Sequence, residues 1–377
     1  MKKICFVTGT RADYGILAPI MKEVAKNPEA RLQIIATTMH LSPAYGMTVG
    51  EIEEDGFTVD AKIASLVEGG TPVDTVKSMA KTQEGLSEAL DRLRPDLVVI
   101  LGDRFEALAA ASAAVVFNIP IVHLHGGETT EGAIDDKFRH AITQLATYHF
   151  ASTPQYVDKI ISMGIRAENV FHSGAPGAEV KEVAEEGLPE LFFSKTGIYP
   201  GEPFILFAFH PVTILEDRGE EELKQTIEAL EAFLNQGYKI LVTMPNSDPG
   251  TLNITDRIMN WASSYPGKVV TVKSLGSKLF HYALETASTI VGNSSAALIE
   301  APSHRLSAVN VGLRQKGRAH GITVIDSPGE REKILKALET ALSLEMKVVM
   351  MGQPISALNP YYKQDSINFI ANRIINF

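Results

Sequence analysis

The chain has 377 residues, which is too long for one common small domain and favours two. Hydrophobic residues make up 45% and charged residues 21%, a balance typical of globular proteins with ample material for hydrophobic cores. The net charge of −10 argues against a nucleic-acid-binding surface, so an anionic ligand would need local arginines and backbone amides.

The single cysteine, Cys5, lies inside an apolar run, which excludes disulfides and cysteine-based zinc sites and indicates a buried core thiol. The first apolar run is interrupted by Arg11 and Asp13 and is too short for a signal peptide. The longest uncharged stretch, residues 107–122, contains a proline and falls short of a membrane span. We therefore expect a cytoplasmic protein that binds no membrane.

The first half of the chain alternates short apolar runs with longer amphipathic segments, the pattern of parallel α/β sheets. The apolar runs predict strands at residues 3–8, 31–38, 96–103, 119–125 and 148–153. The amphipathic segments predict helices from the loop after residue 8 to about Lys26 and at residues 74–93, 105–117, 134–147 and 154–163.

The composition shifts at residues 173–190, which are rich in Gly, Pro and Glu and indicate a linker, and the pattern then restarts. The second half predicts an acidic helix at 219–235, a final amphipathic helix at 366–377, and strands at 203–211, 238–246, 288–295 and 306–312. We therefore predict two doubly wound Rossmann-like domains, residues 1–178 and 196–360. Ligands of such sheets bind outside the carboxyl ends of the strands, so functional residues should follow strands around a shared cleft.

Two loops of the first half follow predicted strands and carry residues that could bind or act on a ligand. In "GTRADYG", Gly9 permits close backbone approach and Arg11 adds a charge near the amides of a helix N-terminus, which together suit a phosphate. A plain turn is the alternative. In "GDRFEA", Asp103 and Arg104 directly follow a strand; the alternative is a helix-capping aspartate beside a solvated arginine.

The stretch "HLHGGETTEGAIDDKFRHA" concentrates imidazoles, glycines and carboxylates after another strand. One of its first two histidines is expected to face the cleft and the other to be packed or exposed. Surface pairs of Asp135 and Asp136 with Arg139 and His140, four residues on, account for Asp136. They do not account for the crowding of His125, Glu128, Glu131 and Asp135. We therefore predict acid–base chemistry and place it above a divalent-metal site, since no third imidazole lies at ligand spacing.

The second half offers groups for a nucleotide diphosphate. Ser294 and Ser295 lie at a strand-to-helix junction, where hydroxyls and helix amides suit a diphosphate, although a simple helix cap is the alternative. Glu300 follows within that helix and could accept ribose hydroxyls. The remaining candidates in strand-end loops are His210, Asn246, Asp248, Arg314 and Arg318.

Seven motifs occur in a fixed order along nearly the whole chain. They are "GTRADYG", "GDR", "HGGE", "IDD", "FHP", "GNSS" and "GLRQKGR". Together they resemble the hydrolysing UDP-N-acetylglucosamine 2-epimerases of sialic-type acid synthesis. The resemblance implies a GT-B fold with a cleft between two Rossmann-like domains, UDP mainly on the second domain, and no metal or redox cofactor. It also implies that the C-terminal segment, residues 361–377, packs back toward the first domain. We expect a homodimer or homotetramer.

Such enzymes break the bond between the anomeric carbon and UDP with loss of the carbon-2 proton, and water then adds to the resulting glycal. By residue matching, the resemblance implies that Asp103 and Asp135 are catalytic carboxylates and that His210 lies near the diphosphate. The positions that match nucleotide-binding residues are Arg11, Arg104, Asn246, Ser294, Ser295, Glu300 and Arg314.

One departure concerns His125, which stands where members of the family commonly have a catalytic glutamate. Either His125 serves as the acid–base group, or Glu128 or Glu131 reaches in. Two substrates compete: UDP-N-acetylglucosamine, the family default that gives N-acetylmannosamine, and UDP-2,4-diacetamido-2,4,6-trideoxyglucose. The alternatives of another class are a GT-B glycosyltransferase, which needs no carbon-2 base, a non-hydrolysing epimerase, and a non-enzymatic sensor of UDP-sugars.

Overall fold

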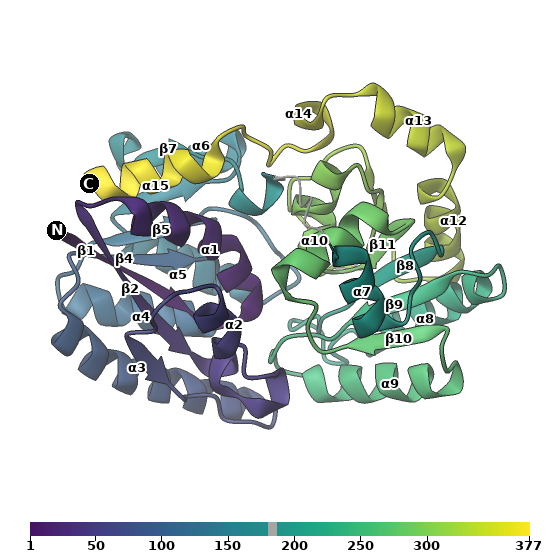
Figure 1. The fold of residues 1–377 in the computed structure, drawn as a ribbon, viewed down its shortest axis with the longest axis horizontal. Coiled ribbons are helices and arrows are strands. Elements are labelled where there is room, and N and C mark those ends of the chain that lie inside the picture. Colours follow the sequence, from purple (N-terminus) through teal and green to yellow (C-terminus); the bar gives the residue numbers. More distant parts are fainter. Residues whose placement is uncertain (180–186) are drawn as a thin grey trace. The chain divides into compact units, whose positions relative to one another are not determined.

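The protein is described by a computed structural model, in which residues 1–179 and 187–377 are placed well enough to describe. The chain forms two compact units (Figure 1). The first unit comprises Met1–Glu128, Ile134–Glu179 and Lys363–Phe377, and the second comprises Thr129–Ala133 and the described part of Val180–Tyr362. Of the predicted linker at 173–190, residues 180–186 lie outside the described residues.

The first unit is built on a seven-stranded sheet with the order β3-β2-β1-β4-β5-β6-β7, and each of its strand pairings is parallel. Its strands are β1 (Lys2–Thr8), β2 (Ala30–Thr37), β3 (Ala61–Ile63), β4 (Leu97–Leu101), β5 (Ile121–Leu124), β6 (Tyr148–Ala151) and β7 (Val170–His172). Its helices are α1 (Arg11–Lys26), α2 (Val49–Glu54), α3 (Pro72–Leu93), α4 (Phe105–Val116), α5 (Asp135–Leu145), α6 (Pro154–Ser162) and α15 (Ser366–Asn376). The strand order reverses between β1 and β4, which is where ligands of doubly wound sheets bind.

The second unit repeats this plan with a six-stranded parallel sheet in the order β10-β9-β8-β11-β12-β13. Its strands are β8 (Phe204–Ala208), β9 (Lys239–Thr243), β10 (Val269–Val272), β11 (Thr289–Gly292), β12 (Ala308–Val311) and β13 (Val324–Ser327). Its helices are α7 (Leu188–Thr196), α8 (Glu220–Leu234), α9 (Thr251–Ser264), α10 (Gly276–Thr286), α11 (Ala296–Ile299), α12 (Arg331–Ala341), α13 (Leu344–Gly352) and α14 (Ile355–Leu358). Here the order reverses between β8 and β11. None of the helices that the structure describes is both long and apolar enough to cross a membrane.

The predicted class, α/β with two doubly wound parallel sheets, is confirmed. The strands that the sequence did not predict are β3, β7, β10 and β13, and these are the two edge strands of each sheet. Each has only three or four residues and includes partly exposed positions, whereas β8 is buried along its whole length. A continuous apolar run marks a strand covered on both faces, so it finds central strands and misses edges.

The core of the first unit lies on both faces of its sheet. Ile4 and Phe6 of β1 enter one hydrophobic cluster, and Cys5 and Val7 enter the cluster on the opposite face. This alternation is the period of a β-strand, and both sets are covered by helices. Burial raises the pKa of the Cys5 thiol, which is the buried core cysteine that the sequence predicted.

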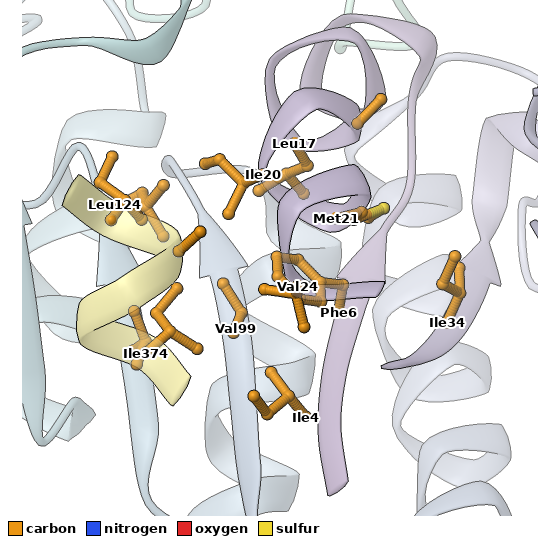
Figure 2. Packing of buried hydrophobic residues seen from close by; sticks show 14 of the residues in the cluster. Ile4, Phe6, Leu17, Ile20, Met21, Val24, Ile34, Val99, Leu124 and Ile374 are labelled. Atoms are coloured by element: carbon orange, nitrogen blue, oxygen red, sulfur yellow. The ribbon is translucent and has the colours of Figure 1, made fainter. Parts of the chain in front are cut away.

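The C-terminal helix α15 belongs to the core of the first unit, although it follows the second unit in sequence. Its residues Ile367, Ile370 and Ile374 are buried at helical spacing, and the helix packs against α1. Figure 2 shows Ile374 near Val99 of β4, and Leu124 of β5 belongs to the same hydrophobic cluster. After the helix, the ring of Phe377 stacks on that of Tyr148, with 3.7 Å between the ring centroids.

We expect Ile374→Ala to lower the free energy of unfolding by about 2–4 kcal/mol, because it removes a fully buried branched side chain and leaves a cavity. Urea unfolding followed by circular dichroism measures the change. Asn372→Ala, an exposed position two residues earlier, is the matched control and should change stability by less than about 0.5 kcal/mol. Equal effects of the two substitutions would show that α15 is not packed in this core.

Candidate active site

Three loops of the first unit leave the carboxyl ends of neighbouring strands. They follow β1, β4 and β5, and these strands are paired in that order within the sheet. The loops carry Gly9 and Arg11, Asp103 and Arg104, and His125 and Glu128. The predicted site residues of the first half therefore meet at one edge of the sheet, at and next to the point where the strand order reverses.

The loop after β1 is closed by a carboxylate of the protein itself. Asp13 accepts hydrogen bonds from the amide of Gly9 (2.9 Å), the amide of Thr10 (2.8 Å) and the hydroxyl of Thr8 (2.9 Å). In return, the hydroxyl of Thr10 accepts from the amide of Asp13 (3.3 Å), which completes a capping box for α1. The amides of Gly9 and Thr10 are thus directed at Asp13, and phosphate binding by this loop stays a prediction. The role of Arg11 in substrate binding stays a prediction.

Glu106 packs behind this loop as a buried acid. A Cβ atom on Gly9 would lie 2.5 Å from Cγ of Glu106 and 2.8 Å from Oγ1 of Thr38, so only glycine fits there. Burial raises the pKa of Glu106, and this rise is opposed by Arg104, whose Nε donates to the carboxylate over 2.7 Å. Arg104 is therefore not a solvated arginine. It is also the N-cap residue of α4, so the alternative role of Asp103 as the helix cap is wrong.

Asp103 is held by Arg139, whose side chain is only 1% exposed. The guanidinium donates to the carboxylate of Asp103, to the main-chain oxygen of Glu128 (3.1 Å) and to the carboxylate of Asp136 (3.4 Å). It thus connects the loop after β4, the loop after β5 and the first turn of α5. The sequence interpretation of Arg139 as part of a surface pair was wrong. The helical spacing of Arg139 with the buried Ile142 and Thr143 would have placed it on the inner face of α5.

His123, the first histidine of the loop after β5, is a packed residue. Burial lowers its pKa to about 3, so the ring is neutral, and its Nε2 lies 2.7 Å from the main-chain oxygen of Gly102. Because a carbonyl can only accept, Nε2 carries the proton and donates it there. His123 therefore holds the backbone immediately before Asp103.

His125 has a different environment from His123. Its φ of +62° is unusual for a residue other than glycine and turns the chain away from the strand direction. Its ring is 7% exposed, and its Nδ1 donates to Oε1 of Glu128 over 2.6 Å. The opposite ring nitrogen, Nε2, is buried and has no hydrogen-bond partner among the residues that the structure describes.

The two acidic candidates of this loop lie in different places. Glu128 is fully buried, and Oε1 of its carboxylate also accepts from the hydroxyl of Ser152 over 2.6 Å. Glu131 belongs to the second unit, where its carboxylate pairs with Lys316 (2.9 Å) and remains half-exposed. The prediction that Glu131 might serve in place of the family glutamate is therefore not supported by its contacts.

In the second unit, Asn293 organises the loops after β8 and β11. Its side chain is fully buried, accepts from the amide of His210 (2.7 Å) and donates to the carbonyl of the same residue (2.8 Å). Its main-chain oxygen accepts from Arg314 (3.1 Å) and from Gln315 (2.9 Å). Asn293 thus positions two predicted ligand-binding residues, and the sequence did not single it out. The adjacent Gly292, at a φ of +131°, was the available signal, because a Cβ there would lie 2.0 Å from the oxygen of Ala208.

The remaining nucleotide-binding candidates lie in neighbouring strand-end loops of the second unit. Arg314 approaches the buried carboxylate of Asp248, with 3.9 Å between the charged atoms. The hydroxyl of Ser294 accepts from the amide of Ala296 over 3.4 Å, and Ser295 is the N-cap residue of the short helix α11. Burial raises the pKa of Glu300 to about 7.

Asn246 and Arg318 are held by contacts of their own loops. The main-chain oxygen of Asn246 accepts from the hydroxyl of Thr251 over 2.5 Å, and Arg318 donates to Gln315 over 2.8 Å. Across residues 1–179 and 187–377, no three His, Cys, Asp or Glu side chains are grouped closely enough to hold a metal ion.

Comparison with known proteins decides the family. The family model described as UDP-N-acetylglucosamine 2-epimerase matches residues 22–375. The chain belongs to this family. It is 35% identical to the hydrolysing UDP-N,N'-diacetylbacillosamine 2-epimerase of Legionella pneumophila, over 91% of this chain and 89% of that protein. It is 33% identical to the hydrolysing GDP/UDP-N,N'-diacetylbacillosamine 2-epimerase of Campylobacter jejuni, over 92% of this chain and 89% of that protein.

The fold of this epimerase is also similar to that of solved structures. The crystal structure of UDP-GlcNAc 2-epimerase from Neisseria meningitidis bound to UDP-GlcNAc matches with a TM-score of 0.82 and 17% sequence identity, over the whole of both chains. The predicted family, the predicted class of enzyme (a hydrolysing UDP-sugar 2-epimerase) and the predicted GT-B type of fold are confirmed. The individual site residues and the sugar stay predictions.

We expect Asp13→Ala to destabilise the epimerase by about 2 kcal/mol or more, because two amides and a hydroxyl of the loop after β1 lose their acceptor. Asp74→Ala is the matched control, since Asp74 closes the same Thr-x-x-Asp capping box on α3 through hydrogen bonds that are exposed to solvent. Thermal unfolding of both variants measures the difference. If Asp74→Ala lowers the melting temperature as much as Asp13→Ala does, the loop after β1 is not closed by its own carboxylate.

Proposed function

We propose that the chain converts a UDP-2-acetamido sugar and water into free UDP and the sugar inverted at carbon 2. Membership of the epimerase family supports the class of reaction. The observation that carries the proposal is a pair of acid–base side chains, Asp103 and His125, which follow neighbouring strands and are each fixed by a buried partner. A glycosyltransferase needs no such base for carbon 2.

The chemistry requires two sets of groups that act together. The carbon-2 proton has no adjacent carbonyl, so it becomes acidic only as positive charge develops at carbon 1. The bond from carbon 1 to the diphosphate oxygen therefore breaks first or together with deprotonation, and UDP takes the electron pair. The electron pair of the broken carbon–hydrogen bond then forms the double bond between carbon 1 and carbon 2 of a glycal. Water adds its oxygen to carbon 1, and a proton returns to the opposite face of carbon 2.

We propose that acid–base side chains of the first unit carry out the proton transfers. Asp103 is held by Arg139 in a fixed position, Asp135 opens α5, and His125 presents the ring nitrogen that bonds no described residue. His125 takes the role that a glutamate has in most of the family, because an imidazole can accept and return a proton near neutral pH.

We propose that groups of the second unit bind the diphosphate and assist the departure of UDP. Preorganised donors at a leaving diphosphate stabilise the developing negative charge by several kcal/mol in such reactions. His210 is fixed through both of its backbone groups by Asn293, which also accepts from Arg314. The further nucleotide-binding residues of the proposal are Arg11, Arg104, Asn246, Ser294, Ser295 and Glu300.

For the sugar, we propose UDP-2,4-diacetamido-2,4,6-trideoxyglucose, which is UDP-N,N'-diacetylbacillosamine, as the preferred substrate. The relatives from Legionella pneumophila and Campylobacter jejuni carry this activity in their names and match the chain over more than nine-tenths of its length. UDP-N-acetylglucosamine is the second candidate, because the family as a whole is described by it.

The reaction is tested by incubating the purified protein with each UDP-sugar in deuterium oxide. We expect free UDP without an added acceptor, one deuterium at carbon 2 of the released sugar, and the higher kcat/KM for the diacetamido substrate. Recovery of both sugar nucleotides intact and unlabelled contradicts the epimerase. UDP release that depends on an added acceptor favours a glycosyltransferase, and a higher kcat/KM for UDP-N-acetylglucosamine overturns the choice of sugar.

Two kinds of variant separate chemistry from binding. We expect Asp103→Asn and Asp135→Asn to lower kcat by about 10²–10⁴-fold, the range for removal of a positioned acid or base, and to retain UDP affinity. We expect Arg314→Ala to weaken UDP binding by about tenfold or more, because a charged donor is lost. Steady-state kinetics and calorimetry with UDP measure both. Unchanged kcat in Asp103→Asn, or unchanged UDP affinity in Arg314→Ala, would remove that residue from its proposed role.

A further inference from the structure

We propose that Glu128, together with Ser152, is a positioning residue that fixes the tautomer and the direction of His125, so that Nε2 of the imidazole carries the lone pair. This inference rests on the proposed function, because it assigns how the acid–base group of that function is prepared. It replaces the catalytic role that the sequence predicted for Glu128.

The hydrogen bonds determine which ring nitrogen carries the proton. Oε1 of Glu128 lies 2.6 Å from Nδ1 of His125 and 2.6 Å from the hydroxyl of Ser152. An ionised carboxylate can only accept, so Nδ1 is the protonated nitrogen of a neutral ring, and Nε2 carries the lone pair. The proton acceptor of His125 is thus the nitrogen on the side of the ring away from Glu128.

Two energetic costs are concentrated at His125. Burial of an acceptor without a partner is unfavourable, and Nε2 is such an atom among the described residues. The φ of +62° is a second strained feature at the same residue. Strained backbones and unsatisfied buried groups cluster at functional sites, where surrounding contacts maintain them. The contacts that maintain His125 are those of Glu128.

The glycine pair explains how Glu128 comes back to His125. Gly127 has a φ of +72°, and a Cβ there would lie 2.6 Å from Ile160. A Cβ on Gly126 would lie 2.8 Å from Nδ1 of His123. Glycine at both positions lets the chain reverse within three residues and brings the carboxylate of Glu128 beneath the ring.

Glu128 itself is enclosed. Its side chain is 0% exposed, Ser152 follows β6 and anchors the carboxylate from the neighbouring strand, and Arg139 fixes its main-chain oxygen. A fully enclosed carboxylate with two donors on one oxygen is placed to act through His125 and not on a sugar. When Nε2 accepts a proton, the negative charge of Glu128 stabilises the resulting imidazolium.

The other ionisable groups around His125 keep one charge state over the pH range of interest. Burial lowers the pKa of His123 on β5 to about 3 and that of His149 on β6 to about 4, so both rings are neutral above pH 5. Arg139 on α5 stays charged. The negative charge next to the ring of His125 is therefore that of Glu128.

The test is the steady-state kinetics of Glu128→Gln, which keeps the shape of the side chain and removes its charge. We expect kcat to fall at least tenfold with UDP affinity unchanged. A merely structural role of Glu128 would lower stability without changing the tautomer of His125.

Ser152→Ala is the second variant, and Ser173→Ala is the matched control. Ser173 is an equally buried serine at the end of the adjacent strand β7, where it bonds only main-chain oxygens among the described residues. We expect Ser152→Ala to lower kcat several-fold without changing KM, and Ser173→Ala to leave both unchanged. Nitrogen-15 spectra of the histidine rings should show one tautomer at His125 in the wild type and a mixture in Glu128→Gln.

The outcomes separate this inference from the proposed function. If the wild-type protein releases no UDP from either sugar, the proposed function fails. If the wild type is active but Glu128→Gln keeps its kcat and a single His125 tautomer, the positioning role is wrong while the epimerase stands.

Discussion

The first unit depends on one buried guanidinium, that of Arg139, which meets groups from three separate segments. Two of these groups are carboxylates, those of Asp103 and Asp136, and the third is the main-chain oxygen of Glu128. A buried charge is tolerated only with such partners, and loss of one partner leaves an uncompensated charge at a cost of about 3–5 kcal/mol. Only arginine offers planar donors in several directions, so lysine could not hold all three groups. The position of Asp103 is thereby linked to the loop that carries His125.

The two histidines of that loop have different roles, because His123 holds the backbone and His125 is the proposed acid–base group. His123 is neutral and donates to the backbone before Asp103, so it adds to the rigidity that Arg139 provides. His125 lies one residue beyond the end of β5, where the strand geometry no longer constrains it and φ becomes positive. The strained conformation persists because its ring and its amide are both anchored, the ring to Glu128 and the amide to the oxygen of Phe150 over 3.1 Å.

Sequence patterns predicted the parts of this protein that depend on residue type and period. Buried central strands appear as apolar runs, and the candidate residues were found because they follow such runs. Arg139 and Asn293 were missed because their roles depend on hydrogen bonds to main-chain oxygens and to residues distant in sequence, which residue type alone does not show. The role of Asp13 in the loop after β1 was missed for another reason: amides that bind a phosphate and amides that bind Asp13 need the same glycine and the same helix N-terminus. The Thr-x-x-Asp spacing was the signal that distinguished them.

Each unit holds its candidate site residues in place with a buried polar side chain, and the two side chains differ in charge. Each places a fully buried polar side chain near the reversal of its strand order, Arg139 in the first unit and Asn293 in the second. The first must fix carboxylates, so it uses a cation. The second must fix Arg314 near a proposed diphosphate, and a carboxylate at position 293 would neutralise that arginine. An amide side chain pairs with the backbone of His210 instead, and only the carbonyl oxygen of Asn293 contacts the guanidinium. The guanidinium of Arg314 also lies 3.9 Å from the carboxylate of Asp248.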